Sequence, residues 1–244
     1  IYAQNPTFRN LTNVVANGVN IQTGQTNIAI TQPVKDYNWT VRLDHKLTEK
    51  DNLTFRMIYN QSSSANVTSN LNFGNLFSAD QFLKDTNVSI SESHVFNSSL
   101  INEFRFSYIR RNLDFPETDT RTPTTTIGGL FGFGGASNFP QSRVSEFFQF
   151  SDTMTYTVGN HNLKFGGDLR YNVLDNFSGF DFKGTFGFNN LQDFLNNNAS
   201  TFTQAFSAAI FDAKQLQQAY FIQDDWRFRS NLTFNLGLRY ETAN

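Results

Sequence analysis

The chain of 244 residues contains no cysteine, which excludes disulfide bonds and thiolate metal sites. It also lacks an uninterrupted apolar run of about 18 residues, the length that a transmembrane helix requires. Only 16% of its residues are charged and the formal net charge is -2, so there is no basic field of the kind that binds nucleic acid. These absences exclude a disulfide scaffold and a helical membrane protein, and they argue against a nucleic-acid partner.

Catalytic and metal-binding motifs are missing as well. The three histidines, His45, His94 and His161, are far apart in the sequence, and no serine stands in a nucleophile elbow. The glycine-rich segment 128–135 has neither of the phosphate-binding glycine spacings and no lysine after it. We therefore predict no catalytic residue, no metal site and no cofactor, and we expect that the protein is not an enzyme.

Aromatic residues are abundant instead. The chain has 28 Phe and 8 Tyr, and aromatic residues make up 16% of it, which favours β-strands. The mean hydropathy of -0.42 is typical of a soluble protein. In a membrane barrel, however, only alternate side chains of each strand face lipid, so the average stays low. The composition therefore leaves a membrane-embedded β-barrel open.

Four segments alternate apolar and polar residues with a period of two. They are Leu53–Tyr59, Leu100–Tyr108, Leu163–Tyr171 and Leu232–Tyr240. Because successive side chains of a strand point to opposite faces, each segment has one apolar and one polar face. The polar face carries Arg42, Asp44, Arg56, Glu103, Arg105, Lys164, Asp168, Arg170 and Arg239. We expect these charged groups to line a wet lumen and to pair with one another.

Each of these segments follows a tight polar turn, and a partner strand precedes the turn. The partner strands run over 39–47, 88–96, 144–156 and 216–228. Polar turn residues suit hairpins, so the pattern predicts four hairpins, or about eight antiparallel strands. The links between hairpins are long, roughly 61–84, 112–142 and 172–213. Short turns on one side and long extracellular loops on the other are typical of an outer-membrane barrel.

Aromatic residues recur at both ends of the predicted strands. The eight steps from Leu163 to Tyr171, at about 3.3 Å each and tilted by about 40°, rise about 20 Å, roughly the apolar height of a membrane. We expect an upper girdle of Tyr59, Tyr108, Tyr171, Tyr240, Trp39 and Tyr220. A lower girdle would contain Phe96, Tyr156, Trp226 and Phe228. Two belts match the two interfaces of a membrane.

The long links contain the ligand-binding candidates. Phe131 and Phe133 lie in the glycine-rich segment, and Phe186 follows a short alternating stretch that begins at Phe180. Phe194 lies in a predicted helical turn capped by Asn190. Loops at the mouth of a barrel often contact a ligand, so we predict a ligand-binding role for these four phenylalanines.

Two hairpins carry a family resemblance. The segment Gln218–Phe228 with Leu232–Glu241, and the segment Gly159–Arg170, resemble strand pairs of TonB-dependent outer-membrane receptors, especially the Oar-like branch. The resemblance implies uptake of a siderophore, glycan or peptide through a barrel in the bacterial outer membrane, surrounded by lipid and energised by TonB through a plug domain. These residues contain neither the plug nor a TonB box. We therefore expect residues 37–244 to be part of a larger barrel and residues 1–36 to be a lead-in segment or loop.

Two other interpretations stay open. In the second interpretation, the chain is a passive structural or adhesive outer-membrane barrel, which could be a complete small barrel of eight strands. A soluble β-binding module is the third interpretation, because alternating strands also build soluble sandwiches. A plug domain directly upstream would favour the receptor, and a monodisperse monomer without detergent would favour the soluble module.

Overall fold

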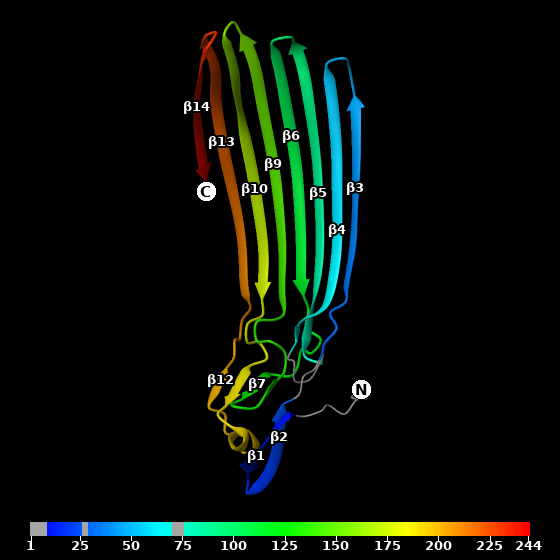
Figure 1. Cartoon of the computed structure of the whole chain (residues 1–244), viewed down its shortest axis with the longest axis vertical. Coiled ribbons are helices and arrows are strands. Elements are labelled where there is room, and N and C mark those ends of the chain that lie inside the picture. The colour runs from blue at the N-terminus through cyan, green and yellow to red at the C-terminus, as the bar shows by residue number, and fades with distance from the viewer. Residues whose placement is uncertain (1–8, 26–28, 70–75) are drawn as a thin grey trace.

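The computed structural model describes residues 9–25, 29–69 and 76–244. Its main feature is an antiparallel sheet of eight strands in the order β14-β13-β10-β9-β6-β5-β4-β3 (Figure 1). The strands are β3 (Val34–Lys46), β4 (Asp51–Ser69), β5 (Ser78–Asn97), β6 (Leu100–Phe115), β9 (Gln141–Val158), β10 (His161–Ser178), β13 (Ala209–Arg229) and β14 (Leu232–Ala243). This arrangement confirms the prediction of about eight antiparallel strands.

Short turns join the strands into the four predicted hairpins, β3–β4, β5–β6, β9–β10 and β13–β14. Polar side chains fix these turns. The Thr48 hydroxyl oxygen accepts the backbone N–H groups of Lys50 and Asp51, each at 3.1 Å. The Asn97 side chain accepts the backbone N–H of Ser99 at 2.9 Å. All four short turns lie at the same end of the sheet, called here the turn end (Figure 1).

The strands extend beyond the alternating segments, so the predicted loop boundaries are wrong. β4 continues to Ser69 and β5 starts at Ser78, although residues 61–84 were expected to form a loop. β10 likewise continues to Ser178. Apolar alternation marks only the part of a strand that has one apolar face. Beyond it, polar residues such as Gln61 keep the same backbone pairing, here with Lys84.

The opposite end of the sheet, the loop end, carries a small second sheet (Figure 1). It consists of β7 (Thr124–Ile127), β8 (Gly132–Phe133), β11 (Thr185–Phe188) and β12 (Thr201–Thr203) in the order β12-β11-β7-β8. β7 and β11 are parallel, so two links that are distant in sequence share this sheet. Together with α1 (Leu191–Leu195), these strands are called the loop module.

Helix α1 confirms the predicted helical turn, since the Asn190 side chain accepts the backbone N–H of Asp193 at 2.9 Å. The alternating stretch predicted from Phe180 is a turn as far as Gly184, and the strand begins only at Thr185. Asp181 and Gly184 both have positive φ, whereas the regular extended conformation of a strand has negative φ. Among the described residues, no helix is long and apolar enough to cross a membrane.

A hairpin of β1 (Arg9–Ala16) and β2 (Val19–Gln25) precedes the main sheet, within the predicted lead-in segment. It lies at the loop end, where the Gln192 side chain of α1 hydrogen-bonds to Asn17 in the hairpin turn. Residues 1–8 and 26–28 of the lead-in segment lie outside the described residues. β3 begins at Val34, slightly before the predicted boundary at residue 37.

The main sheet has little conventional core. Large apolar side chains such as Leu43 and Leu238 are exposed, at 61% and 73% of their surface. So many exposed large apolar side chains are unusual on a soluble protein, because burying apolar surface is favourable by about 25 cal/mol per Å² of buried area. One face of the sheet therefore requires contact with an apolar environment.

Candidate functional site

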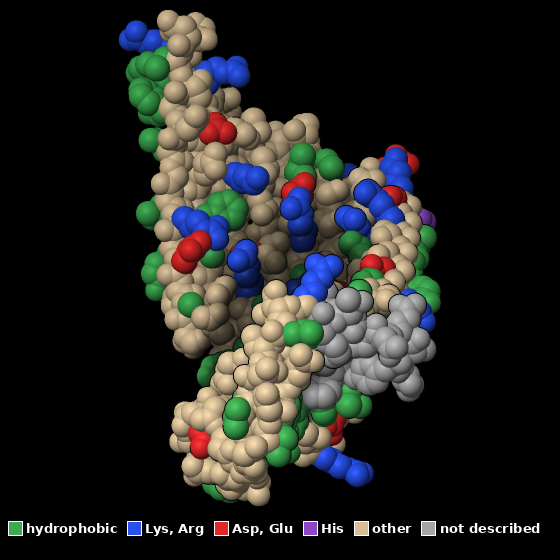
Figure 2. All heavy atoms as spheres, turned by 60° about the horizontal axis from the view of Figure 1, so that its bottom comes forward, with side chains coloured by type: hydrophobic (Ala, Val, Ile, Leu, Met, Phe, Trp, Pro, Cys, Tyr) green, Lys and Arg blue, Asp and Glu red, His purple; other side chains and the backbone are tan. Residues whose placement is uncertain are grey.

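The main sheet separates its side chains into two faces, and neighbouring rows of the sheet show this directly. One row across seven strands is Val41, Met57, Val88, Tyr108, Phe148, Tyr171 and Leu216. The adjacent row, one residue along each strand, is Arg42, Arg56, Ser89, Ser107, Gln149, Arg170 and Gln217. The first row belongs to the apolar face and the second to the polar face. Figure 2 shows Lys and Arg side chains gathered over the hollowed face of the sheet.

Ion pairs on the polar face join residues two positions apart in one strand. The Arg42 guanidinium lies 2.7 Å from the Asp44 carboxylate. Arg105 and Glu103 are 3.2 Å apart, Arg170 and Asp168 are 2.8 Å apart, and Arg239 pairs with Glu241. These pairs confirm the predicted pairing for most of the lumenal residues. Most of these side chains are about half exposed or more, so solvent screens the pairs and each contributes little to stability.

Two of the predicted lumenal cations, Arg56 and Lys164, form no ion pair within the part of the chain that the structure describes. Arg56 lies beside Arg42, which is already paired with Asp44. Lys164 lies between Thr155 and Gln223. The polar face therefore keeps cationic groups that are available to an anionic surface.

Small hydroxyl residues cover the middle of the polar face. The serine strip consists of Ser89, Ser91, Ser93, Ser107 and Ser151, on three neighbouring strands. On one side it is flanked by Arg42 and Arg56, and on the other by a hollow of about 330 Å³ lined by Asp168, Arg170, Arg239 and Glu241, among others. Short side chains leave room for a close partner, and the flanking charges offer it hydrogen bonds.

Aromatic side chains group at both ends of the apolar face. Midway along the strands, where the apolar alternation ends, Trp39 stacks on Tyr59 at 5.5 Å, and Tyr108 packs against Phe148 at 4.8 Å, as measured between ring centroids. Near the turn end, Trp226 lies 5.8 Å from Phe234. Asp224 also belongs to the apolar face, whereas Asp225 belongs to the polar face, because successive side chains of a strand point to opposite faces. A role of these side chains as two aromatic belts at the membrane interfaces stays a prediction.

Three of the four ligand-binding candidates lie in one aromatic cluster of the loop module. Phe133 packs against Phe194 at 5.9 Å, and Phe186 packs against Phe202 at 4.5 Å. Phe188 connects the two pairs, since its ring lies 5.2 Å from Phe194 and 6.5 Å from Phe186. Sequence reasoning missed Phe188 and Phe202, although Phe188 continues the alternation that starts at Phe186.

The fourth candidate, Phe131, lies in the β7–β8 turn and is 38% exposed. Its backbone carbonyl accepts the Ile127 N–H at 2.9 Å, which holds the turn. A ligand-binding role for Phe131, Phe133, Phe186 and Phe194 stays a prediction.

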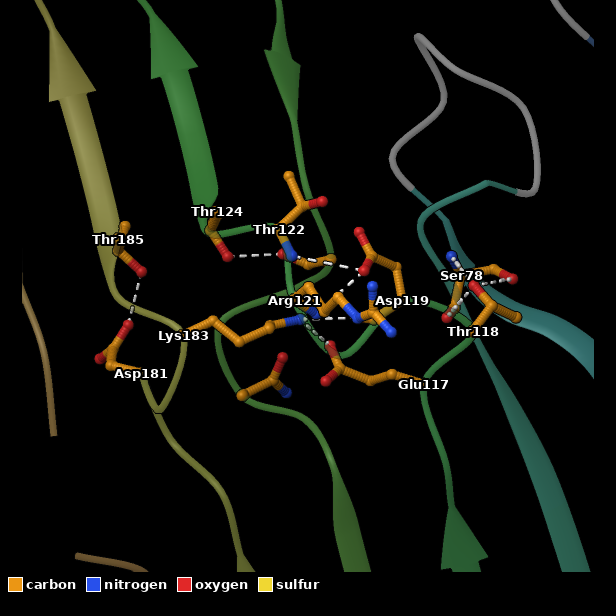
Figure 3. A network of polar contacts seen from close by, with 12 residues as sticks. Ser78, Glu117, Thr118, Asp119, Arg121, Thr122, Thr124, Asp181, Lys183 and Thr185 are labelled. Atoms are coloured by element: carbon orange, nitrogen blue, oxygen red, sulfur yellow. Dashed lines mark hydrogen bonds and ion pairs between the residues drawn. The ribbon is translucent and has the colours of Figure 1, made fainter. Parts of the chain in front are cut away.

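A buried ion pair holds the loop module together (Figure 3). Lys183, just before β11, pairs with Glu117, which follows β6, and only 9% and 2% of their side chains are exposed. Lys183 also donates to the backbone carbonyl of Asp119 at 3.3 Å. One Glu117 oxygen, Oε2, is buried and has no hydrogen-bond partner within the described residues. Sequence reasoning missed this pair, because neither residue belongs to a recognisable motif.

Carboxylates around this ion pair have shifted pKa values. Burial raises the pKa of Glu117, and its pairing with Lys183 opposes that shift only in part. The side-chain hydrogen bond from Thr122 lowers the pKa of Asp119. Nearby, the Thr118 N–H donates to the Ser78 carbonyl at 2.9 Å, which ties the segment to the start of β5. The network thus connects two links and one strand of the main sheet.

Comparison with known proteins identifies this architecture. Residues 2–244 match the model of a family described as an outer membrane beta barrel domain. Among solved structures, the outer membrane transporter YddB from Escherichia coli is similar at 13% identity with a TM-score of 0.60, over 94% of this chain and 29% of YddB. BauA, the ferric preacinetobactin receptor from Acinetobacter baumannii, is similar at 10% identity with a TM-score of 0.54, over 91% of this chain and 35% of BauA.

The two solved structures are too distant in sequence to indicate more than the fold. No curated protein matches the chain. The chain spans about a third of the length of the transporters it resembles. The predicted fold class, antiparallel strands of an outer-membrane β-barrel, is confirmed by the family match and the sheet.

Proposed function

Because the chain belongs to the outer membrane beta-barrel domain family and is a protein of the bacterial outer membrane, we propose that it forms the wall of a TonB-dependent receptor. The proposed receptor takes up a large nutrient of the siderophore, glycan or peptide class. The observation that carries this proposal is the hollowed polar face, with its serine strip between Arg42 and Arg56 on one side and the ion-paired Arg170 and Arg239 on the other. The proposed role is transport and involves no catalysis.

Further strands are needed to close this wall. Within the described residues, β3 and β14 each pair on one side only, so both edges of the sheet present free backbone groups. A membrane-spanning sheet cannot leave such groups exposed to lipid, since each would cost several kcal/mol. The sequence motifs of the β9–β10 and β13–β14 hairpins support the Oar-like branch of these receptors.

The polar face suits a lumen that holds a plug. Arg56 and Lys164 form no ion pair within the described part of the chain, and the serine strip provides hydroxyl groups without bulk. A plug segment with anionic groups from elsewhere in the same protein would satisfy these cations. Contacts of this kind let an energised movement of the plug open a path for the ligand.

A passive adhesive barrel is the second candidate, and the β1–β2 hairpin favours it. This hairpin lies at the loop end and exposes Leu11, Val15 and Val19, all more than half exposed. Exposed apolar side chains on a projecting hairpin are suited to binding another surface.

Uptake assays in the source bacterium test the proposal. Cells that lack the gene are compared with complemented cells for uptake of ferric siderophores, glycans and peptides, with and without a protonophore. The proposal predicts that uptake of one class depends on the gene and stops with the protonophore. Uptake that continues without the proton gradient, or a defect in adhesion alone, would support the passive barrel.

A further inference from the structure

We propose that Asp51, Glu92 and His94 bind a divalent transition-metal ion, Zn²⁺ being the best-suited candidate. The three residues lie at the turn end of the apolar face, at the start of β4 and near the end of β5. Their ligand atoms all lie within 4.8 Å of one another. The sequence predicts no metal site here, because Asp51 and His94 are 43 positions apart in the chain. Only the pairing of β4 with β5 brings the two side chains together.

Strand register places the three side chains on the same face. Asp51 is paired with His94, and Leu53, two residues further along β4, is paired with Glu92. Side chains of directly paired residues lie on one face of a sheet, and so do those two positions apart. All three ligands therefore point to the same side without any change of backbone.

The Asp51–His94 half of the site is preorganised. The Asp51 carboxylate contacts the His94 Nδ1 atom and accepts the Thr48 hydroxyl. The adjoining turn is anchored to β5, because the Val95 N–H donates to the Lys50 carbonyl at 2.9 Å and Lys50 Nζ donates to the Phe96 carbonyl at 3.1 Å. Only 29% of His94 and 21% of Asp51 is exposed, so both side chains have restricted freedom.

Charge on this face points to a cation. Glu92 is paired with Leu53 on one side and Phe104 on the other, and it forms no ion pair among the described residues. Asp51 and Glu92 place two carboxylates close together on a face where most side chains are apolar. Uncompensated carboxylates on such a face are costly. A divalent cation between the two carboxylates would cancel their charge.

Ligand chemistry selects the type of metal. One imidazole nitrogen and two carboxylate oxygens are common Zn²⁺ ligands, at about 2.0–2.2 Å from the ion. Ligands at that distance are separated by roughly 3–4 Å, so binding needs small side-chain rotations that widen the Asp51–His94 contact and keep Glu92 within reach. Three protein ligands leave one tetrahedral position for water. Imidazole favours a transition metal over Mg²⁺ or Ca²⁺, which prefer oxygen ligands.

A second His–Asp pair provides a matched control. His161 Nδ1 lies 2.7 Å from the Asp224 carboxylate, also at the turn end of the apolar face, and the His161 ring stacks on Trp226. Among the described residues, only the Asp51 cluster brings three such ligands together. Loss of His161 should therefore leave metal binding unchanged.

The test uses the full-length protein that carries this chain, purified in detergent micelles without a histidine tag and stripped with EDTA. Zn²⁺ binding is measured by titration calorimetry and Co²⁺ binding by visible absorption, for the unmodified protein and for His94→Ala, Glu92→Gln and His161→Ala. Heat-dependent migration on gels verifies that each variant is folded.

We expect His94→Ala to lose one bound Co²⁺ with its absorption bands, Glu92→Gln to weaken binding at least about tenfold, and His161→Ala to bind as the unmodified protein does. The proposal is overturned if Glu92→Gln, which keeps the size of the side chain, binds Zn²⁺ as tightly as the unmodified protein. Equal losses in His94→Ala and His161→Ala would also overturn it, because the binding would then be non-specific.

Discussion

Arg56 and Met57 are neighbours in β4 and belong to opposite faces of the sheet, since Arg56 pairs with Arg42 and Ser89 while Met57 pairs with Val41 and Val88. In an outer-membrane barrel, the first faces the wet lumen and the second faces lipid. This relationship gives the most direct test of the placement of the sheet in the membrane.

The chain has no cysteine of its own, so single cysteines at these two positions can be labelled selectively. Arg56→Cys should react with a charged, water-soluble maleimide in intact outer membranes. Met57→Cys should react only with a lipophilic maleimide, because lipid excludes the charged reagent. Both variants should react equally after denaturation in detergent. Equal reaction of both positions in the membrane would contradict the assignment of the two faces.

The sequence predicted the four hairpins because apolar alternation and polar turns are local signals. Thr48 and Asn97 fix their turns with their own side chains, so the turn positions are readable from a few residues. The strand ends beyond the apolar face were not predictable in this way. Pairs such as Gln61 with Lys84 depend on backbone hydrogen bonds that any residue makes.

The contacts that join distant segments could not be predicted from the sequence either. Glu117 and Lys183 come together only because β7 and β11 pair in parallel, and nothing near either residue indicates that pairing. The same holds for Asp51, Glu92 and His94, which share a surface through the β4–β5 register. Local patterns thus specify the hairpins, whereas the sites between hairpins arise from tertiary pairing.

The buried pair in the loop module should respond strongly to loss of one partner. Lys183→Met leaves the Glu117 carboxylate buried without a cation, which is expected to destabilise the module by about 3–5 kcal/mol. The double variant Glu117→Gln/Lys183→Met should recover part of that loss. Hydrogen exchange of residues 117–135 and 183–203 measures the effect. Lys46→Met, at the exposed pair with Glu49, is the control and should change stability by no more than about 1 kcal/mol.

Acidification should strengthen the loop module through Glu117. Burial raises the pKa of Glu117 above its ordinary value of 4.5, so the folded module binds a proton at a pH where the unfolded chain does not. This contribution to stability therefore grows as the pH falls through the raised folded pKa, and it is complete below 4.5. The pKa of Asp119 is lowered from 3.8, so its own contribution is lost only at still lower pH.

Hydrogen exchange, corrected for the intrinsic effect of pH on the exchange rate, tests whether acidification stabilises the loop module. Protection of the loop module should increase between neutral pH and pH 4.5 in the unmodified protein. Glu117→Gln should remove this pH dependence, because the amide does not titrate. A loss of protection over the same range in the unmodified protein would mean that the attraction to Lys183 outweighs burial.

Alanine variants of Phe131 and Phe194 should distinguish a direct contact with the ligand from a role in packing the loop module. Phe194 packs against Phe133 and Phe188, so Phe194→Ala should create a cavity in the aromatic cluster and destabilise the module by about 3–5 kcal/mol at most, less where solvent enters. Phe131 lies at the edge of the module, in the β7–β8 turn, and is 38% exposed, so Phe131→Ala should change the hydrogen exchange of the module less than Phe194→Ala does. Reduced uptake in Phe131→Ala with normal exchange would support a direct ligand contact. Uptake reduced only in Phe194→Ala would instead assign these phenylalanines a role in packing, and the predicted ligand contact of Phe131 would be wrong.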